Sequence, residues 1–255
     1  MLFMLILIFP IFCFGQRNNS DSSIYSEDIK LETSIHFTKD DGLPSNFIRS
    51  VTETNDGFIW IGTGDGLSRF DGSQFKNFQY DLEDSTSIFD NRINPIIADS
   101  QNLYLGTHLG FSIMNLQTEK FRNFQFYKYQ VSDTLDKKIP TRVLSLDKTN
   151  NGEIWMGTFS DGVFRYSPEA DTLRCYHFPH EEVGKYFPAT WRVDHILGIK
   201  QDRYNDSIIW AATIAGLLQI NAMTHEMKWF HNPKTNEKTF YRKTHFVLYI
   251  SILMV

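Results

Sequence analysis

A short pattern recurs four times along this chain, and it constrains the fold more than any other feature of the sequence. The copies read IWIGTGDGLSRF, LYLGTHLGFSIMN, IWMGTFSDGVFRYS and IWAATIAGLLQIN, starting at Ile59, Leu103, Ile154 and Ile209. Each has an aromatic residue, a small residue, a threonine, a glycine and a large apolar residue in the same order. A spacing of roughly 44 to 55 residues is typical of one four-stranded β-propeller blade per repeat.

The first copy also fits a glycine-rich phosphate loop, because Gly62, Gly64 and Gly66 form a GxGxG pattern. A phosphate loop occurs once, after a strand, and opens a helix. Here the residues after Gly66 alternate and stop at Asp71-Gly72, which indicates a strand and a turn. Four copies without a following helix therefore favour a repeated structural corner.

Each repeat follows one plan of four strands, and each of its positions has a structural interpretation. Inner strands are expected to start at Phe47, Arg92, Arg142 and His195, and outer strands at Phe75, Phe121, Leu173 and Met227. Turns such as Asn55-Asp56-Gly57 are typical of hairpins. The repeated Trp60, Trp155 and Trp210 are assigned to packing. The small residues Gly62, Gly106, Gly157 and Ala212 are expected to let neighbouring blades approach closely.

The pattern predicts an all-β fold, a β-propeller of about four four-stranded blades. Residues 34–231 are assigned to the repeats, with blades at about 43–80, 88–126, 139–178 and 190–231. Ile35 and Phe37 alternate like a strand ahead of them. Residues 1–15 are apolar and interpreted as a signal peptide, although no Lys or Arg precedes the apolar core. Residues 16–33 form a flexible lead-in, and 232–255 a truncated or aberrant tail.

Charge and cysteine content exclude several function classes. The net charge is -5, which argues against a nucleic-acid partner, because such partners need a basic footprint. Removal of the signal peptide would leave Cys175 as the only cysteine, so no internal disulfide or cysteine-based metal site is expected. No GxSxG, HExxH or Walker motif occurs. The sequence therefore predicts no catalytic residue, metal or cofactor.

The repeat resembles the two-component regulator propeller repeat. The residues that carry the resemblance are Leu43-Pro44-Ser45-Asn46, then VTETNDGFIWIGTGDGLSRFDG and FKNFQY. The resemblance covers about residues 35–231; the second and fourth copies depart from it at Tyr104 and Ala212. It implies a periplasmic sensor of a hybrid two-component system that detects oligosaccharides from polysaccharide breakdown.

Members of that family carry two seven-bladed propellers and a β-sandwich, followed by a membrane helix, histidine kinase, receiver and DNA-binding domain. This chain shows about four repeats and none of the downstream parts, so it is interpreted as an incomplete part of a seven-bladed propeller. Membrane attachment is expected only through those missing parts, and a homodimer only in a full-length parent.

Blade geometry selects the candidate ligand-binding residues. The loop before each inner strand and the loop between the second and third strands should open on one face. The candidates there are Arg92, Arg142, His195, Trp191, Arg192, His108, Asp65 and Asp161, with Asn46 and Phe159 beside them. Aromatic faces pack on sugar C–H groups, while charged and polar groups hold hydroxyls. The competing interpretation of each is an ordinary turn residue.

Three functions remain open at this point. The first is an exported, oligosaccharide-sensing propeller that performs no chemistry. The second is a propeller enzyme, a lyase or hydrolase, which would need clustered acids, histidines or a metal. The third is a structural or interaction propeller, or a non-functional remnant.

Overall fold

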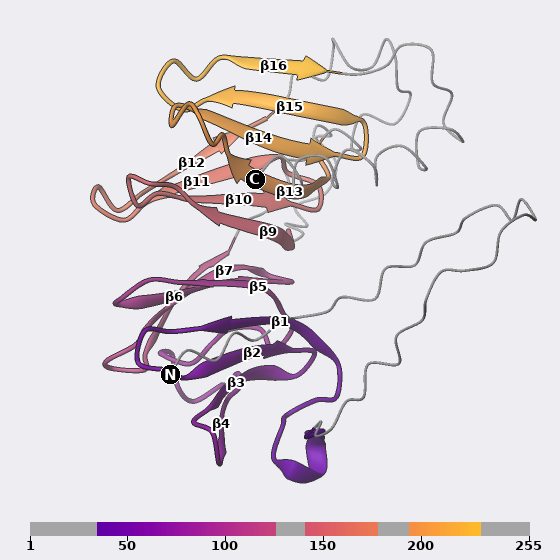
Figure 1. Ribbon diagram of the computed structural model, residues 1–255, viewed down its shortest axis with the longest axis vertical. Coiled ribbons are helices and arrows are strands. Elements are labelled where there is room, and N and C mark those ends of the chain that lie inside the picture. The colour runs from indigo at the N-terminus through magenta and orange to yellow at the C-terminus, as the bar shows by residue number, and fades with distance from the viewer. Residues whose placement is uncertain (1–34, 126–140, 178–193, 231–255) are drawn as a thin grey trace, which may run out of the picture. The chain divides into compact units, whose positions relative to one another are not determined.

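The computed structural model describes residues 35–125, 141–177 and 194–230, which form four antiparallel sheets (Figure 1). The chain divides into two units, and the second, Phe37–Val255, contains the strands of all four sheets. Within every sheet the strands are ordered as in the chain, so neighbouring strands are joined as hairpins. The all-β class and the four four-stranded blades predicted from the repeats are confirmed.

The strand bounds agree closely with the repeat plan. The first blade contains β1 (Ile48–Glu53), β2 (Ile59–Thr63), β3 (Gly66–Phe70) and β4 (Phe75–Phe78). The second contains β5 (Ile93–Ala98), β6 (Asn102–Thr107), β7 (Gly110–Asn115) and β8 (Phe121–Gln125). The third contains β9 (Val143–Lys148), β10 (Ile154–Thr158), β11 (Val163–Ser167) and β12 (Thr172–Tyr176). The fourth contains β13 (Ile196–Gln201), β14 (Ile208–Thr213), β15 (Gly216–Asn221) and β16 (Met227–Phe230).

The repeated threonine and glycine close the turn between the second and third strands. Thr63 Oγ1 donates to the Gly66 carbonyl at 2.8 Å and accepts from the Asp65 amide at 3.0 Å. The other three blades repeat this pair of bonds, and all four threonines are fully buried. Gly66 has φ +123°, which a residue with a side chain rarely adopts. The repeated pattern thus encodes a turn, as the repeat argument predicted.

The hydrophobic core lies between successive blades. Trp60 of β2 packs with Leu103, Leu105 and Phe121 of the second blade. Tyr104 takes the place of the tryptophan in the second blade and packs against the third, and Trp155 packs against the fourth. Each fully buried large side chain stabilises the fold by roughly 1.5–3 kcal/mol. The assignment of Trp60 and Trp155 to inter-blade packing is confirmed.

Inner strands of successive blades approach closely where the small residues lie. β1 contacts β5, β5 contacts β9, and β9 contacts β13. A Cβ atom built on Gly62 would lie 2.9 Å from Ile93 Cγ2, and one on Gly106 would lie 2.7 Å from Val143 Cγ1. Such distances leave no room for a methyl group. The expected close approach of blades at these glycines is confirmed.

Charged groups also link successive blades, beside the apolar contact between them, which we call the seam. Asp147 of β9 is buried. Its carboxylate accepts hydrogen bonds from Lys200 Nζ at 2.8 Å and from the Gln201 amide at 2.7 Å, both from β13. Asp99, after β5, likewise accepts Lys148 Nζ of β9 at 2.9 Å. A buried carboxylate is tolerated because each oxygen has a charged or backbone donor.

Three turn residues that precede outer strands have left-handed backbones without being glycine. They are Glu119 (φ 55°), Asp171 (φ 50°) and His225 (φ 64°). Each contacts the preceding blade: Glu119 Oε1 lies 2.7 Å from Arg69 Nη1, Asp171 Oδ1 lies 2.6 Å from Arg122 Nη2, and His225 Nδ1 lies 3.0 Å from Tyr176 Oη. The backbone cost of roughly 1–3 kcal/mol at such positions is offset by these contacts.

The segment before β1 is not the strand suggested by the alternation of Ile35 and Phe37. Residues 35–38 have no strand pairing, and a short 3-10 helix, η1 (Lys39–Asp41), follows with Thr38 as its N-cap. The ring centroid of Phe37 lies 5.0 Å from that of Phe70, so Phe37 packs on the outer part of the first blade.

The part of the chain that the structure describes contains no helix that could span a membrane.

Candidate functional site

Two loops of each blade meet at one end of its sheet, which we call the mouth. The residue before the inner strand accepts a hydrogen bond from the residue after the repeated threonine. The bonds are Gly64 N to Phe47 O (2.9 Å), Phe159 N to Arg142 O (2.8 Å) and Ile214 N to His195 O (3.2 Å). The prediction that both loops open together therefore agrees with the backbone contacts in three of the blades.

Strand register identifies equivalent mouth positions and moves one of the expected residues. Ile48, Ile93, Val143 and Ile196 pair with the four threonines, so the residues before them are equivalent. Those residues are Phe47, Arg92, Arg142 and His195. Asn46 was expected in this set, but its side-chain oxygen instead accepts the Lys39 amide at 2.8 Å. The first blade thus presents an aromatic ring where the others present a cation or an imidazole.

A register shift follows this position in every inner strand, and it brings Arg49 and Asn94 to the mouth. Such bulges re-aim side chains and occur often near binding sites. Arg49 Nη1 donates to Asn94 Oδ1 at 3.0 Å, and Asn94 Nδ2 donates to the Val143 carbonyl at 2.9 Å. Three blades are thereby linked at the mouth. Sequence reasoning missed both residues. Asn94 lies two positions after the candidate Arg92, and Arg49 lies three positions after Asn46, the residue expected at the mouth of the first blade.

Arg49, Arg92 and Arg142, which we call the arginine cluster, lie close enough to act on one another and on His108. Burial, followed by Arg92 and Arg142, lowers the pKa of His108 to about 4. Burial, followed by Arg49 and Arg92, lowers the pKa of Arg142. His108 is therefore neutral at pH 7, and the three guanidinium groups supply the positive charge.

Asp90 is the acidic member of this group. It is buried, and its Oδ1 accepts the Arg92 amide at 3.1 Å and Arg92 Nε at 3.3 Å. The Arg92 side chain remains half exposed. This contact holds the Arg92 guanidinium at its Nε atom, and half of the side chain remains accessible.

Aromatic rings border the arginine cluster. The guanidinium carbon of Arg142 lies 4.6 Å from the ring centroid of Phe159, and the His195 ring lies 4.4 Å from the same ring. Burial and then Arg142 lower the pKa of His195 to about 4. Arg49 lies 4.7 Å from the ring centroid of Phe47. Phe47 and Phe159 are both exposed, so apolar ring faces and cations share one surface.

The other four candidate residues do not join the arginine cluster: two serve turns, and two lie outside the described residues. Asp65 is exposed, but its Oδ1 accepts Asn91 Nδ2 at 3.1 Å and its carbonyl accepts Gln79 Nε2, which are turn contacts. Asp161 is only 2% exposed, and its amide donates to Thr158 Oγ1, so it serves the turn rather than the mouth surface. Trp191 and Arg192 lie outside the described residues. The structure thus brings Arg92, Arg142, His108 and His195 together.

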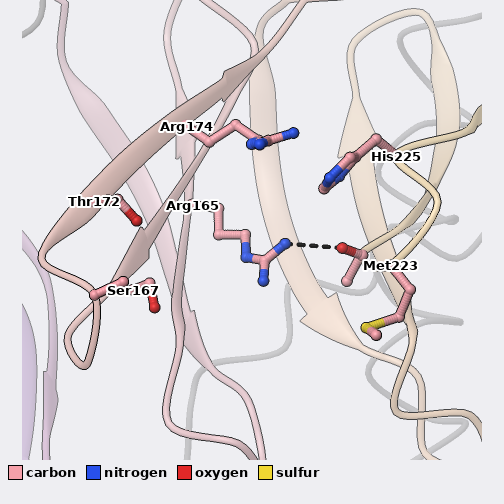
Figure 2. Close-up of a pocket in the computed structure, with 8 residues that line it drawn as sticks. Arg165, Ser167, Thr172, Arg174, Met223 and His225 are labelled. Carbon is pink, nitrogen blue, oxygen red and sulfur yellow. Dashed lines mark hydrogen bonds between the residues drawn. The ribbon is translucent and has the colours of Figure 1, made fainter.

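Away from the mouth, a hollow of about 340 Å³ lies between the third blade and the turn before β16 (Figure 2). Arg165 and Arg174 face Met223 and His225 across it. Arg165 Nη1 donates to the Ala222 carbonyl at 2.8 Å, and its Nη2 pairs with Glu153. These contacts occupy the guanidinium, so this hollow is best described as part of the seam between blades.

Comparison with known proteins supports the resemblance noted in the repeats. Residues 42–65 match the family model of the two component regulator propeller, which confirms the resemblance for the first repeat. A segment of 52 residues is 44% identical to Histidine kinase P4 of Formosa agariphila. That segment is 20% of this chain and 4% of the kinase, so the match spans only a small part of each protein.

Solved structures share the fold. The extracellular domain of BT3049, described as a hybrid two component system of B. thetaiotaomicron, gives a TM-score of 0.59 at 19% identity, covering 78% of this chain and 26% of that one. Virginiamycin B lyase from Staphylococcus aureus gives a TM-score of 0.53 at 14% identity, covering 77% and 59%. At these identities the likeness establishes the β-propeller architecture, and the chain spans only part of each neighbour.

Proposed function

We propose that this chain is part of the exported, ligand-sensing propeller of a hybrid two-component signalling protein, and that its mouth binds an oligosaccharide. The observation that carries the proposal is the two-component regulator propeller repeat at residues 42–65. The local identity to a histidine kinase and the fold shared with an extracellular sensor domain support it.

The chemistry of the mouth supports a sugar ligand. Exposed rings of Phe47 and Phe159 offer faces for C–H groups, and Arg49 and Arg92 offer donors for oxygens. In a parent with a kinase, a ligand that binds one arrangement of the sensor more tightly than another would shift the population between them. Regulation of polysaccharide utilisation would follow from that shift.

The proposal assigns binding and no catalysis to this chain. The described residues contain no group of three His, Cys, Asp or Glu side chains placed to hold a metal ion. Cys175 Sγ lies 3.2 Å from His177 Nε2, a pairing that a thiol nucleophile could use. Burial, followed by Asp161, raises the pKa of that thiol to about 12, which makes it a poor nucleophile at neutral pH. Its surroundings therefore favour a structural thiol.

A thermal-shift series tests the proposed function. The chain is heated with maltotriose, xylotriose, laminaritriose and trigalacturonate, each at several concentrations. A sugar that binds the folded chain raises Tm, and the added stability grows with the logarithm of the sugar concentration, reaching about 2.7 kcal/mol at a hundredfold excess over Kd. Chromatography of each sugar after incubation, with and without EDTA, separates a binder from a lyase or hydrolase. Turnover of any sugar, or no shift with all four, would contradict the proposal.

A further inference from the structure

The arginine cluster concentrates positive charge that is only partly offset among the residues that the structure describes. Arg49, Arg92 and Arg142 come from three successive blades, and each acts electrostatically on His108. Asp90 is the acidic group that acts on the same imidazole. Three cations held near one carboxylate repel one another, and an arginine cannot relieve this by losing its proton. An arrangement of this kind is stabilised by a bound anion.

Two buried nitrogen atoms at the same place are available to such an anion. Arg142 Nε and His108 Nε2 are buried and make no hydrogen bond with any described residue. Native proteins rarely leave a buried donor without a partner, because such a group has lost its hydrogen bonds with water. Arg142 Nε always carries a proton, and His108 Nε2 donates in the tautomer that carries the imidazole proton on that nitrogen. The guanidinium carbon of Arg142 also lies 4.6 Å from the ring centroid of Phe159, a contact that restrains the guanidinium. A fixed guanidinium is well suited to a planar or tetrahedral oxyanion.

The seam hollow of Figure 2 is a weaker anion site. Its Arg165 is already paired with Glu153 and with the Ala222 carbonyl. Arg49 and Arg142, in contrast, pair with no carboxylate within the described part of the chain. The mouth also has exposed aromatic faces beside its cations.

We propose that the arginine cluster binds the anionic group of the ligand, a carboxylate or a sulfate ester, and that the ligand is an acidic rather than a neutral oligosaccharide. The sugar part of this inference rests on the proposed function, and the anion part does not. Arg142 and His108 contact the anion at its buried side, Arg49 and Arg92 at its exposed side, and the two phenylalanine rings pack on the adjoining sugars.

Isothermal titration with four probes tests both parts. The probes are trigalacturonate, its neutral counterpart galactotriose, a sulfated galactose disaccharide, and inorganic sulfate. The wild-type chain is expected to bind trigalacturonate or the sulfated disaccharide at least about tenfold more tightly than galactotriose, because each charge-assisted contact is strong. The affinities for trigalacturonate and for the sulfated disaccharide show whether the site prefers a carboxylate or a sulfate ester.

Variants locate the site. Arg49→Gln and Arg92→Gln change exposed side chains, and each is expected to weaken acidic-sugar binding about tenfold, since each removes a charge-assisted contact. Arg174→Gln is the matched control, because it removes one exposed arginine at the seam hollow and should leave binding unchanged. The Nε–H NMR signal of Arg142 should shift on saturation with the acidic probe.

The outcomes separate this inference from the proposed function. Equal binding of galactotriose and trigalacturonate, unaffected by Arg49→Gln and Arg92→Gln, overturns the anion site and leaves an oligosaccharide sensor. Sulfate binding that depends on both arginines, without binding of any sugar, supports the anion site and contradicts the sugar ligand. Binding lost in Arg174→Gln but retained in the mouth variants moves the site to the seam and overturns the inference, as does no binding of any probe.

Discussion

The close approach of blades at the inner glycines makes a quantitative prediction for Gly106. A Cβ atom on this residue would lie 2.7 Å from Val143 Cγ1 of the third blade and 2.8 Å from Pro95 Cδ of its own blade. Val143 is fully buried, so it cannot move aside into solvent. Overpacking of this kind costs about 1–3 kcal/mol. Gly106→Ala should lower the free energy of unfolding by that amount.

A second substitution tests whether the contact across the seam is the cause. Val143→Ala alone should cost about 2 kcal/mol, because it removes two buried methyl groups and leaves a small cavity. In the double variant the methyl group introduced by Gly106→Ala would occupy the space that Val143 Cγ1 leaves. The double variant should therefore be more stable than the sum of the single effects by about 1 kcal/mol or more. Pro95 limits the recovery, because its contact remains.

Urea unfolding followed by tryptophan fluorescence measures these effects. The control is Gly152→Ala, since Gly152 has φ +84° and no atom within 4 Å of a built Cβ. Its cost comes from backbone strain and should add to that of Val143→Ala within about 0.5 kcal/mol. A neutral Gly106→Ala, or the same coupling to Val143→Ala in both glycine variants, would refute the argument that blade contact requires the glycine.

Three further predictions concern other parts of the structure. Asp147→Ala should lower the free energy of unfolding by about 2–3 kcal/mol, because it removes both inter-blade hydrogen bonds. Asp147→Asn should cost less, because asparagine can still accept a hydrogen bond from the Gln201 amide. Equal costs of the two variants in urea unfolding would argue against the inter-blade hydrogen bonds. Cys175, with its thiol pKa raised to about 12, should react with iodoacetamide at pH 8 much more slowly in the folded chain than in urea, and equal rates would contradict its burial. His108 and His195 have folded pKa values of about 4 against a usual 6.5, so the unfolded state binds more protons between these values. Stability from both groups should be complete above pH 6.5 and decline as the pH falls toward 4, and a His108→Asn, His195→Asn variant that keeps the full wild-type slope would contradict this.

The fold was predictable because its information is local and repeated. Each strand could be located from the aromatic residue, the threonine and the glycine of its repeat, and the threonine hydroxyl closes the same turn four times. The strand expected at Ile35 and Phe37 was wrong, because alternation over so few residues does not distinguish a strand from a segment whose ring packs on Phe70.

The candidate site was only partly predictable. Arg92, Arg142, His108 and His195 were found by counting from the repeats, since equivalent positions in equivalent blades reach the same end of each sheet. Arg49 was missed because a bulge in β1 re-aims it, and bulges leave little trace in the alternation of apolar and polar residues. Asp161 was placed on the mouth surface, but the turn of the third blade is one residue longer and buries it.

The sequence by itself determined the strand order, the turns and the small residues at the seams, because these depend on chemistry within one repeat. Only the tertiary structure decided which charges meet. Arg49, Arg92 and Arg142 are more than forty residues apart in sequence and act on one imidazole only because three blades pack in register. Electrostatic energy depends on distance in space and on burial, and neither is set until the blades are packed.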